Sequence, residues 1–356
     1  MAARSARRPM LTGRPLLDSR ADMALYLPRP QPESALRQAV EQGLNVALEG
    51  ARGSGRSSML RALLFAARTH EPDGPDVPAA SHPAEPWHYL RAASARSAAD
   101  LVRLVAAAVL GGDSGAPTPV PADDFAHDAS LASAGASFGA AAGDDPLALV
   151  ADLTRRLRTD PSQRHVVLLD DADPRLANQL FGVLRDELWG LPVQWVVAVT
   201  PDDAPVLLRP PADAFFERRV ELPPLTAAEA EELIALRLGH PVQVPAGQEE
   251  WTPRDALDLA RLAPAEWSAS VQEKARRDVE VAKLGRPATM LVAAMEELGP
   301  VSPSDDRLLA RTGWTSSRAS QVFRQLLDVG LVAYREVRGD RPGRPARLYE
   351  LRPLRG

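Results

Sequence analysis

Continuous apolar runs alternate with amphipathic stretches through the first two thirds of the chain. The runs predict short buried strands at residues 44–48, 87–92, 165–169 and 194–199. Between them, apolar residues recur every three or four positions, which predicts helices at 33–42, 57–70, 98–110, 147–157 and 176–188. Strands alternating with helices predict an α/β fold, a parallel sheet flanked by helices with its ligand site at the carboxyl ends of the strands.

The last third has a different pattern, helical first and mixed at the end. Thr226 and Glu229 form a capping box that predicts a helix to Leu238, and helical periodicity continues to about residue 284. Further helices are predicted at 289–298, 305–311 and 316–329, and two short strands at 331–337 and 346–351. Three helices followed by a hairpin predict a C-terminal winged helix-turn-helix.

A glycine-rich turn joins the first predicted strand to the helix after it. Its spacing, Gly50-x4-Gly55-x-Ser57, matches the phosphate-binding P-loop except where Arg56 replaces lysine. In such loops, backbone N–H groups and the positive end of the helix face phosphate oxygens. We predict that ATP or ADP is bound here by the loop residues Gly50, Gly53, Ser54, Gly55, Arg56, Ser57 and Ser58.

The strand at 165–169 ends in two carboxylates that fit a Walker B motif. We predict that Asp170, together with Ser57, holds Mg²⁺ and that Asp171 polarises the attacking water. The alternative is a buried strand that merely ends in an acidic turn.

Together these motifs resemble AAA+ and STAND-type P-loop ATPases, near the origin-recognition-like group with a C-terminal winged helix. The resemblance rests on residues 45–58, 168–173, 196–200 and 218–226, and spans about 25–356 apart from one insertion. It implies that Thr200 is the sensor 1 residue and that Arg218 or Arg219 acts on a neighbouring subunit's nucleotide. It also implies a sensor 2 arginine in a Gly-x-Pro-Arg-like segment, but the corresponding place, residues 263–267, has none.

Arg56 changes the expected chemistry because arginine is longer and bulkier than lysine and is not equivalent to it at a shaped site. The positive charge is kept, so phosphate binding can survive. Hydrolysis depends on donors placed where charge develops, so we expect it to be weak or absent. In the alternative, the loop binds nothing and the fold is retained as a scaffold.

The C-terminal end is basic, in contrast to the rest of the chain. The chain carries a net −5, but from Leu331 onward seven arginines stand against three acidic residues, so this end carries +4 and the rest −9. A basic end on an acidic protein is typical of polyanion binding. We predict that double-stranded DNA is contacted by Ser316, Ser317, Arg318, Gln321 and Arg324 of the third helix and by Arg338, Arg341, Arg344 and Arg347 of the hairpin. The alternative is a winged helix that binds protein or one that only packs on the ATPase lid.

Composition excludes disulfides and membrane spans and indicates where the domains begin and end. The 356 residues include no cysteine, no apolar run of membrane-spanning length and no secretory signal, so we expect a cytoplasmic protein without disulfides and without membrane association. The predicted parts are a flexible leader at 1–22, an AAA+-like nucleotide-binding domain at 23–224 with a disordered insertion at 111–145, a helical lid at 225–285 and a winged helix domain at 286–356.

Two functions follow from these features. The first is a nucleotide-controlled DNA-binding protein, with weak or absent ATP hydrolysis, that positions its winged helix on DNA. The second is a non-catalytic, oligomerising scaffold or adaptor of a larger assembly, such as a defence or mobile-element system. Homo-oligomers or partner proteins are plausible in both.

Overall fold

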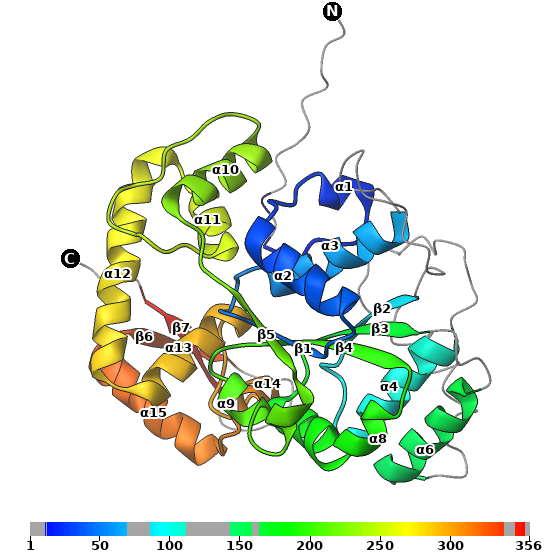
Figure 1. Ribbon diagram of the computed structural model, residues 1–356. Helices are drawn as coiled ribbons and strands as arrows, with labels where there is room; N and C mark the ends of the chain where they lie inside the picture. The colour runs from blue at the N-terminus through cyan, green and yellow to red at the C-terminus, as the bar shows by residue number, and fades with distance from the viewer. Residues whose placement is uncertain are drawn as a thin grey trace, which may run out of the picture. The chain divides into compact units, whose positions relative to one another are not determined.

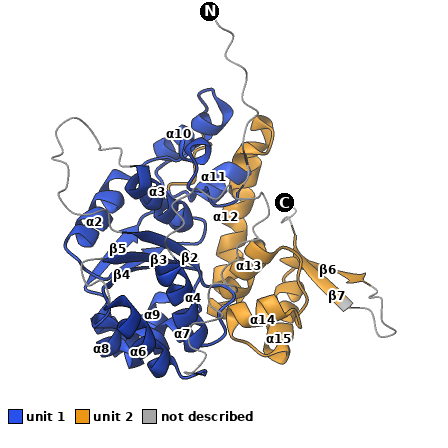
Figure 2. Ribbon diagram, turned by 90° about the vertical axis from the view of Figure 1, so that its right-hand side faces the viewer, with its two compact units in different colours: residues 1–242, 250–258 blue, residues 243–249, 259–356 orange. Residues whose placement is uncertain are grey.

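The computed structural model describes residues 11, 13–69, 86–111, 143–158, 164–337 and 346–352. The chain divides into two compact units (Figure 2), unit 1 with residues 1–242 and 250–258, and unit 2 with residues 243–249 and 259–356. The segment predicted as a lid, 225–285, is thus shared between the units. The predicted insertion lies outside the described residues except for 111 and 143–145.

Unit 1 is built on a five-stranded parallel sheet with the order β2-β3-β4-β1-β5. Its strands are β1 (Val46–Gly50), β2 (Trp87–Arg91), β3 (His165–Asp170), β4 (Val193–Val199) and β5 (Arg218–Leu222). The predicted parallel α/β architecture is confirmed. The edge strand β5 was not predicted, because it alternates exposed charged residues with buried Val220 and Leu222 and lacks a continuous apolar run.

Helices cover both faces of this sheet (Figure 1). Alternate residues of β4 point to opposite faces, so Trp195 joins one core cluster and Val196 the other. The Trp195 cluster is covered by α4 (Ala98–Leu110), α6 (Pro146–Leu157) and α8 (Arg185–Trp189), and the Val196 cluster by α2 (Pro30–Glu41) and α3 (Arg56–Thr69). Burial on both faces explains the continuous apolar sequences of β3 and β4.

The remaining elements of unit 1 are short, except for one helix of the predicted lid. They are α1 (Arg20–Met23), α7 (Pro174–Asn178), η2 (Gln179–Val183), α9 (Ala204–Leu207), η3 (Ala212–Phe215), α10 (Ala227–Leu238) and α11 (Pro253–Ala260). The single helix predicted at 176–188 is therefore interrupted by the π-helical turn η2. A Cβ at Gly182 in this turn would lie 3.2 Å from the backbone nitrogen of Ala212, so glycine permits the close packing there.

Unit 2 contains η4 (Pro264–Glu266), α12 (Trp267–Lys283), α13 (Arg286–Leu298), α14 (Asp306–Thr312), α15 (Ser316–Asp328), β6 (Val332–Val337) and β7 (Ala346–Leu351). The last three helices and the two strands correspond to the segments predicted for a winged helix-turn-helix. The last two strands pair antiparallel. Phe323 of α15 is fully buried and stacks on Tyr349 of β7, with ring centroids 4.4 Å apart, which joins the helices to the hairpin in one core. Within the described ranges, no helix is long and apolar enough to span a lipid bilayer.

Candidate functional site

The carboxyl edge of the sheet brings the predicted phosphate loop and two predicted catalytic positions together. The loop follows β1, Asp170 and Asp171 stand at the end of β3, and Thr200 follows β4, which lies between β3 and β1. The charges of Asp170 and Asp171 act on Arg56 of the loop. A single site can therefore contain all three groups.

Arg56 is folded back onto the sheet. Its Nη1 donates a short hydrogen bond to the Gly50 carbonyl and a second, of 3.2 Å, to the Val199 carbonyl. Its Nε is buried without a hydrogen-bond partner in the described part of the chain. Burial lowers the pKa of Arg56 from its usual value, although the nearby carboxylates act in the opposite direction. The guanidinium thus ties the ends of β1 and β4 together.

Asp170 is almost fully buried and both its oxygens accept hydrogen bonds. The Tyr89 hydroxyl donates to Oδ2 at 2.7 Å, and the Asp171 amide donates to Oδ1 at 3.0 Å. The guanidinium carbon of Arg61 lies 4.6 Å from the centre of the Tyr89 ring. Burial and the charge of Asp170 raise the pKa of Tyr89, so this phenol remains a donor at neutral pH.

Asp171, the predicted catalytic carboxylate, is held in a different way. Its backbone has φ of +54°, which is rare outside glycine, and its Oδ2 accepts a hydrogen bond from Arg91 Nε at 2.8 Å. Both side chains are largely exposed, so the pair adds little to stability. Arg91 therefore engages one oxygen of this carboxylate, which keeps acceptor capacity toward solvent.

Thr200, the predicted sensor, is buried and bonded within its own turn. Its hydroxyl donates to Asp203 Oδ2 at 2.7 Å and accepts from the Asp203 amide at 3.1 Å. The hydroxyl hydrogen is therefore already used, and a phosphate oxygen would have to compete with a carboxylate for it.

Arg254 lies beside the loop, although the sequence analysis did not select it. The Arg254 amide donates to the Gly53 carbonyl at 3.3 Å. A Cβ at Gly53, where φ is +76°, would lie only 2.8 Å from Arg254 Cβ, so both conformation and close approach require glycine. The residues Thr252-Pro253-Arg254 complete a Gly-x-Pro-Arg-like segment that has Trp251 at its first position. Recognising this imperfect match would have found the arginine; the expected place, 263–267, instead contains η4 of unit 2.

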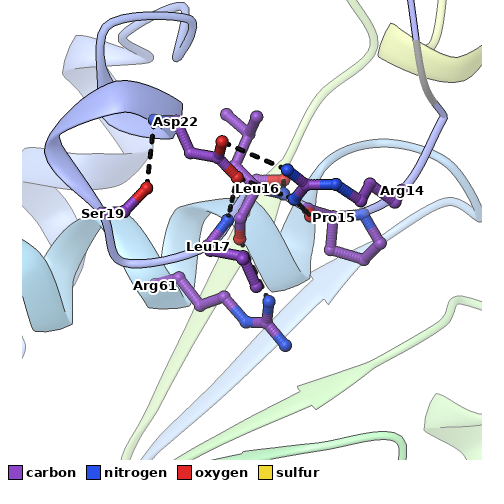
Figure 3. A network of polar contacts seen from close by, with 8 residues as sticks. Arg14, Pro15, Leu16, Leu17, Ser19, Asp22 and Arg61 are labelled. Carbon is purple, nitrogen blue, oxygen red and sulfur yellow. Dashed lines mark hydrogen bonds and ion pairs between the residues drawn. The ribbon is translucent and has the colours of Figure 1, made fainter. Parts of the chain in front are cut away.

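A strap formed by residues 13–23 runs along α3 (Figure 3). The Leu16 amide donates to Ser58 Oγ at 3.1 Å, and Arg61 Nη1 donates to the Leu16 carbonyl at 3.3 Å. The predicted ligand Ser58 is thus engaged by the strap. Part of the segment predicted as a flexible leader, residues 13–22, is ordered against the domain in this way.

The strap is fixed by a buried carboxylate. Asp22 accepts hydrogen bonds from Arg14 Nη1 and from the Leu17 amide, both at 2.7 Å (Figure 3). Burial would raise the pKa of Asp22, but these hydrogen bonds and the charges of Arg14 and Arg237 lower it overall. Because Arg237 belongs to α10, the network electrostatically links the strap to a lid helix.

A mostly apolar cavity of about 50 Å³ lies next to the loop. Ser54 and Gly55 of the loop form one wall, and the Ser54 hydroxyl is buried there without a hydrogen-bond partner among the described residues. The other walls come from the strap, the segment before α2 and α10, through Leu16, Leu25, Tyr26, Leu27, Arg29, Ser58, Met59, Leu222, Leu225, Leu233, Arg237 and Pro253. An apolar pocket beside a phosphate loop can take the base of a nucleotide.

The residues present fit a nucleotide and, through water, a magnesium ion. The first N–H groups of α3 have no partner inside the helix, and the orphan Ser54 hydroxyl adds a buried polar atom. Ser57 lies in the first turn of α3, and each oxygen of Asp170 keeps acceptor capacity beyond its one hydrogen bond. Within the described ranges, no group of three or more metal-ligating side chains provides a metal site of its own.

Arg218 and Arg219 lie at the amino ends of the strands, whereas the loop lies at their carboxyl ends. They begin β5 and pair in register with Val46 and Ala47, whereas the loop follows Gly50, which pairs with Leu222. Both arginines are exposed. In this chain they are therefore not brought to the loop, and only a neighbouring molecule could receive them.

In unit 2, the predicted DNA-contacting residues of α15 share one surface. The predicted apolar residues of this helix are buried, while Ser316, Ser317, Arg318, Gln321 and Arg324 are all exposed. Thr315 caps the helix by accepting the Arg318 amide at 3.3 Å, and Arg318 Nη1 donates to Gln321 Oε1 at 2.8 Å. The helix thus offers a basic, polar face.

Only one of the four predicted hairpin arginines falls within the described residues. Arg347 is exposed, stacks its guanidinium 4.4 Å from the centre of the Tyr334 ring, and lies 3.8 Å from Glu336. Arg338, Arg341 and Arg344 lie outside the described residues.

Known proteins were compared with this chain by sequence and by structure. No family model and no curated protein matches it. Similar solved structures include the Aeropyrum pernix Orc1 protein in complex with DNA, at 17% identity over 92% of this chain and 90% of that chain, with a TM-score of 0.46. Cdc6p from Pyrobaculum aerophilum is similar at 14% identity over 93% of each chain (TM-score 0.44). The RuvB Holliday junction branch migration motor of Thermotoga maritima is similar at 16% identity over 89% and 92% (TM-score 0.36). The parallel sheet with its glycine loop between β1 and α3 gives unit 1 the fold of a P-loop NTPase.

Proposed function

We propose that this chain is an AAA+-like, nucleotide-controlled DNA-binding protein of the origin-recognition-like group. The carrying observation is the P-loop at the carboxyl edge of the sheet, with an apolar cavity at its side and, in the wall, the buried Ser54 hydroxyl, which has no partner among the described residues. The nucleotide is ATP or ADP, bound by residues 50–58. Mg²⁺ is held by Ser57 and, through water, by Asp170, and when bound it neutralises phosphate charge.

Binding in this proposal involves the strap and α10, which both line the cavity. The strap supplies one wall through Leu16, and polar contacts to Ser58, Arg61 and Arg68 of α3 hold it in place. We expect the nucleotide to shift the strap and α10 together, because the charge of Arg237 in α10 acts on Asp22 of the strap. Arg254 then lies where it can contact a bound phosphate, the role of the expected lid arginine.

Hydrolysis is weak or absent in this proposal. Three groups that a P-loop ATPase uses on its terminal phosphate are bonded elsewhere: Arg56 to backbone carbonyls, Asp171 to Arg91, and Thr200 to Asp203. Catalysis of phosphoryl transfer is mostly positioning and electrostatic stabilisation, so misplaced donors lower turnover more than affinity.

The DNA-binding part of the proposal belongs to unit 2. The exposed face of α15 carries Arg318, Arg324 and hydrogen-bonding side chains on a helix whose opposite face is firmly packed. Such a helix suits the major groove, and the hairpin arginines suit the phosphate backbone.

A salt series of DNA binding tests this proposal. Deletion of residues 331–356 is not a suitable test, because Leu331, Val332 and Tyr349 belong to the core of unit 2 and their loss would disrupt its packing. The double variant Arg318→Ala/Arg324→Ala keeps the fold and removes two exposed cations. We expect it to reduce the salt slope of log affinity for double-stranded DNA by about 1 to 2. Lys283→Ala, which removes an exposed cation of α12, is the control. Equal slopes for all three proteins would sink the role of α15, and unchanged DNA affinity with and without nucleotide would sink nucleotide control.

The second candidate function is an oligomerising scaffold without turnover. It is favoured by the same commitments of Arg56, Asp171 and Thr200 and by exposed apolar side chains near α8, where Val183 is 71% exposed and Trp189 47%. Measurement of mass in solution at several concentrations, with wild type and Val183→Ser/Trp189→Ser, tests it. A monomer at every concentration that also binds DNA under nucleotide control would exclude the scaffold.

A further inference from the structure

We propose that Arg56 makes the loop a receptor for a nucleoside diphosphate and discriminates against the triphosphate. The inference rests on the proposed nucleotide binding and assigns the ligand class of that same site. It makes Arg56 a specificity-determining residue and not a replacement for the usual lysine.

The guanidinium of Arg56 lies at the ends of two adjacent strands. Its Nη1 contacts the carbonyls of Gly50 and Val199, the last residues of the adjacent strands β1 and β4. The P-loop lysine normally reaches the β- and γ-phosphates from this region. Here the planar end of Arg56 fills the space in front of β1 and β4, next to Thr200, where a terminal phosphate has to be received.

Two donor groups on this side, Nη1 of Arg56 and the Thr200 hydroxyl, are already engaged. The Nη1 hydrogens point at carbonyl oxygens, and the Thr200 hydroxyl donates to Asp203. Drawing Arg56 away to serve a phosphate would leave the buried carbonyl of Val199 without this donor. Leaving a buried polar group unsatisfied opposes such a movement.

Charge also opposes a terminal phosphate here. Asp170, Asp171 and Asp203 act electrostatically on Arg56 and Arg52 acts in the opposite sense, so three of these four charged groups are carboxylates. A terminal phosphate would add negative charge to that cluster, whereas a diphosphate ends before it. Like charges at close range in a partly buried site are unfavourable.

The opposite side of the loop keeps what a diphosphate needs. The N–H groups in the first turn of α3 have no intrahelical partner, and they face the loop's phosphate-binding concavity in this fold. Ser54 is only 3% exposed, and its hydroxyl at the wall of the apolar cavity has no partner in the part of the chain that the structure describes. A base, a ribose and two phosphates can therefore be held without displacing Arg56.

Calorimetric titration of nucleotide-free protein, in Mg²⁺, with ADP and with a non-hydrolysable β,γ-imido analogue of ATP tests the proposal. We expect wild type to bind ADP at least about ten-fold more tightly than the analogue. Arg56→Lys, with its shorter and narrower side chain, should move this ratio about ten-fold toward the triphosphate. Arg155→Lys, at an exposed position of α6 that does not line the cavity, should leave the ratio unchanged.

If a variant fails to fold, the ratio of ADP affinity to analogue affinity in the wild-type protein still tests the diphosphate preference. Equal affinities, or a preference for the triphosphate analogue, would overturn the diphosphate inference while leaving nucleotide binding intact. Absence of binding of either compound would overturn both the inference and the nucleotide part of the proposed function. An Arg56→Lys protein with the wild-type ratio would remove Arg56 as the discriminating residue.

Discussion

Arg56 of unit 1 and the arginines of α15 in unit 2 are presented in opposite ways. In unit 1, Arg56 is buried and bonded to the protein's own backbone. In unit 2, Arg318 and Arg324 of α15 are exposed on a helix whose other face is packed. A buried cation acts through shape and a few fixed contacts, whereas exposed cations act through a field that salt screens. The two candidate sites should therefore respond to different perturbations.

The stabilities of the two units should differ most in their response to pH. His88 Nε2 and His165 Nδ1 lie 3.2 Å apart in unit 1, next to the charge of Arg68, whereas unit 2 contains no histidine. Burial lowers the pKa of His88 to about 4 and also lowers that of His165. The unfolded chain, with a histidine pKa near 6.5, then binds more protons between pH 6.5 and about 4, so stability is lost as pH falls through this window.

We expect unit 1 to lose on the order of 3 kcal/mol across this window. Denaturant unfolding followed by tryptophan fluorescence measures it. His88→Gln should flatten the profile, and His240→Gln, which changes an exposed histidine, should not. A profile of wild type without any slope from pH 6.5 to 4 would mean that the pair titrates normally.

Gly53→Ala tests how tightly the loop is packed. The substitution places a Cβ at φ of +76° and 2.8 Å from Arg254 Cβ, so the loop and the start of α11 must separate. We expect a loss of about 2 kcal/mol in unfolding free energy and loss of nucleotide binding. DNA affinity without nucleotide should stay at the wild-type level, measured by fluorescence anisotropy. Gly247→Ala, also at positive φ but with open space around it, controls for strain alone.

Thr315→Ala tests unit 2 by its helix cap. Removing the hydroxyl that accepts the Arg318 amide should cost about 1 kcal/mol in the stability of unit 2. The salt slope of DNA binding should not change, because no cation is lost. Thr315→Ser keeps the cap and serves as the control. A changed slope would show that the cap itself contacts DNA.

Arg347→Ala should have the smallest effect. Its guanidinium stacks on Tyr334 and is near Glu336, so the side chain is only partly available. We expect a decrease of roughly 1 in the salt slope and a few-fold weaker DNA binding. Arg347→Lys should restore the slope. Unchanged binding by Arg347→Ala would mean that, of the residues tested in unit 2, only those of α15 contact DNA.

Sequence patterns were sufficient where burial is two-sided or strictly periodic. The continuous apolar sequences of β3 and β4 and the amphipathic α15 were predicted nearly to the residue. The edge strand β5 and the π-helical turn η2 were missed, because edge exposure and the close approach of Gly182 to Ala212 depend on the tertiary structure. Local pattern carries no signal for such contacts.

For the candidate site, the sequence predicted which residues lie at the carboxyl edge but not what they contact. The bonds of Arg56 to Val199, of Tyr89 to Asp170 and of Arg91 to Asp171 all join different strands or loops. No spacing rule encodes such pairs. Arg254 was missed for a related reason, since its motif is imperfect and its docking on Gly53 is a long-range contact.

The central claim is that the P-loop binds a nucleotide without turning it over. Phosphate release from saturating ATP and Mg²⁺, measured on protein whose nucleotide binding has been established by titration, tests it most directly. We predict binding of one nucleotide per chain with phosphate release indistinguishable from the protein-free blank. Steady release on the order of 1 s⁻¹, within the ordinary range for enzymes, would contradict the account.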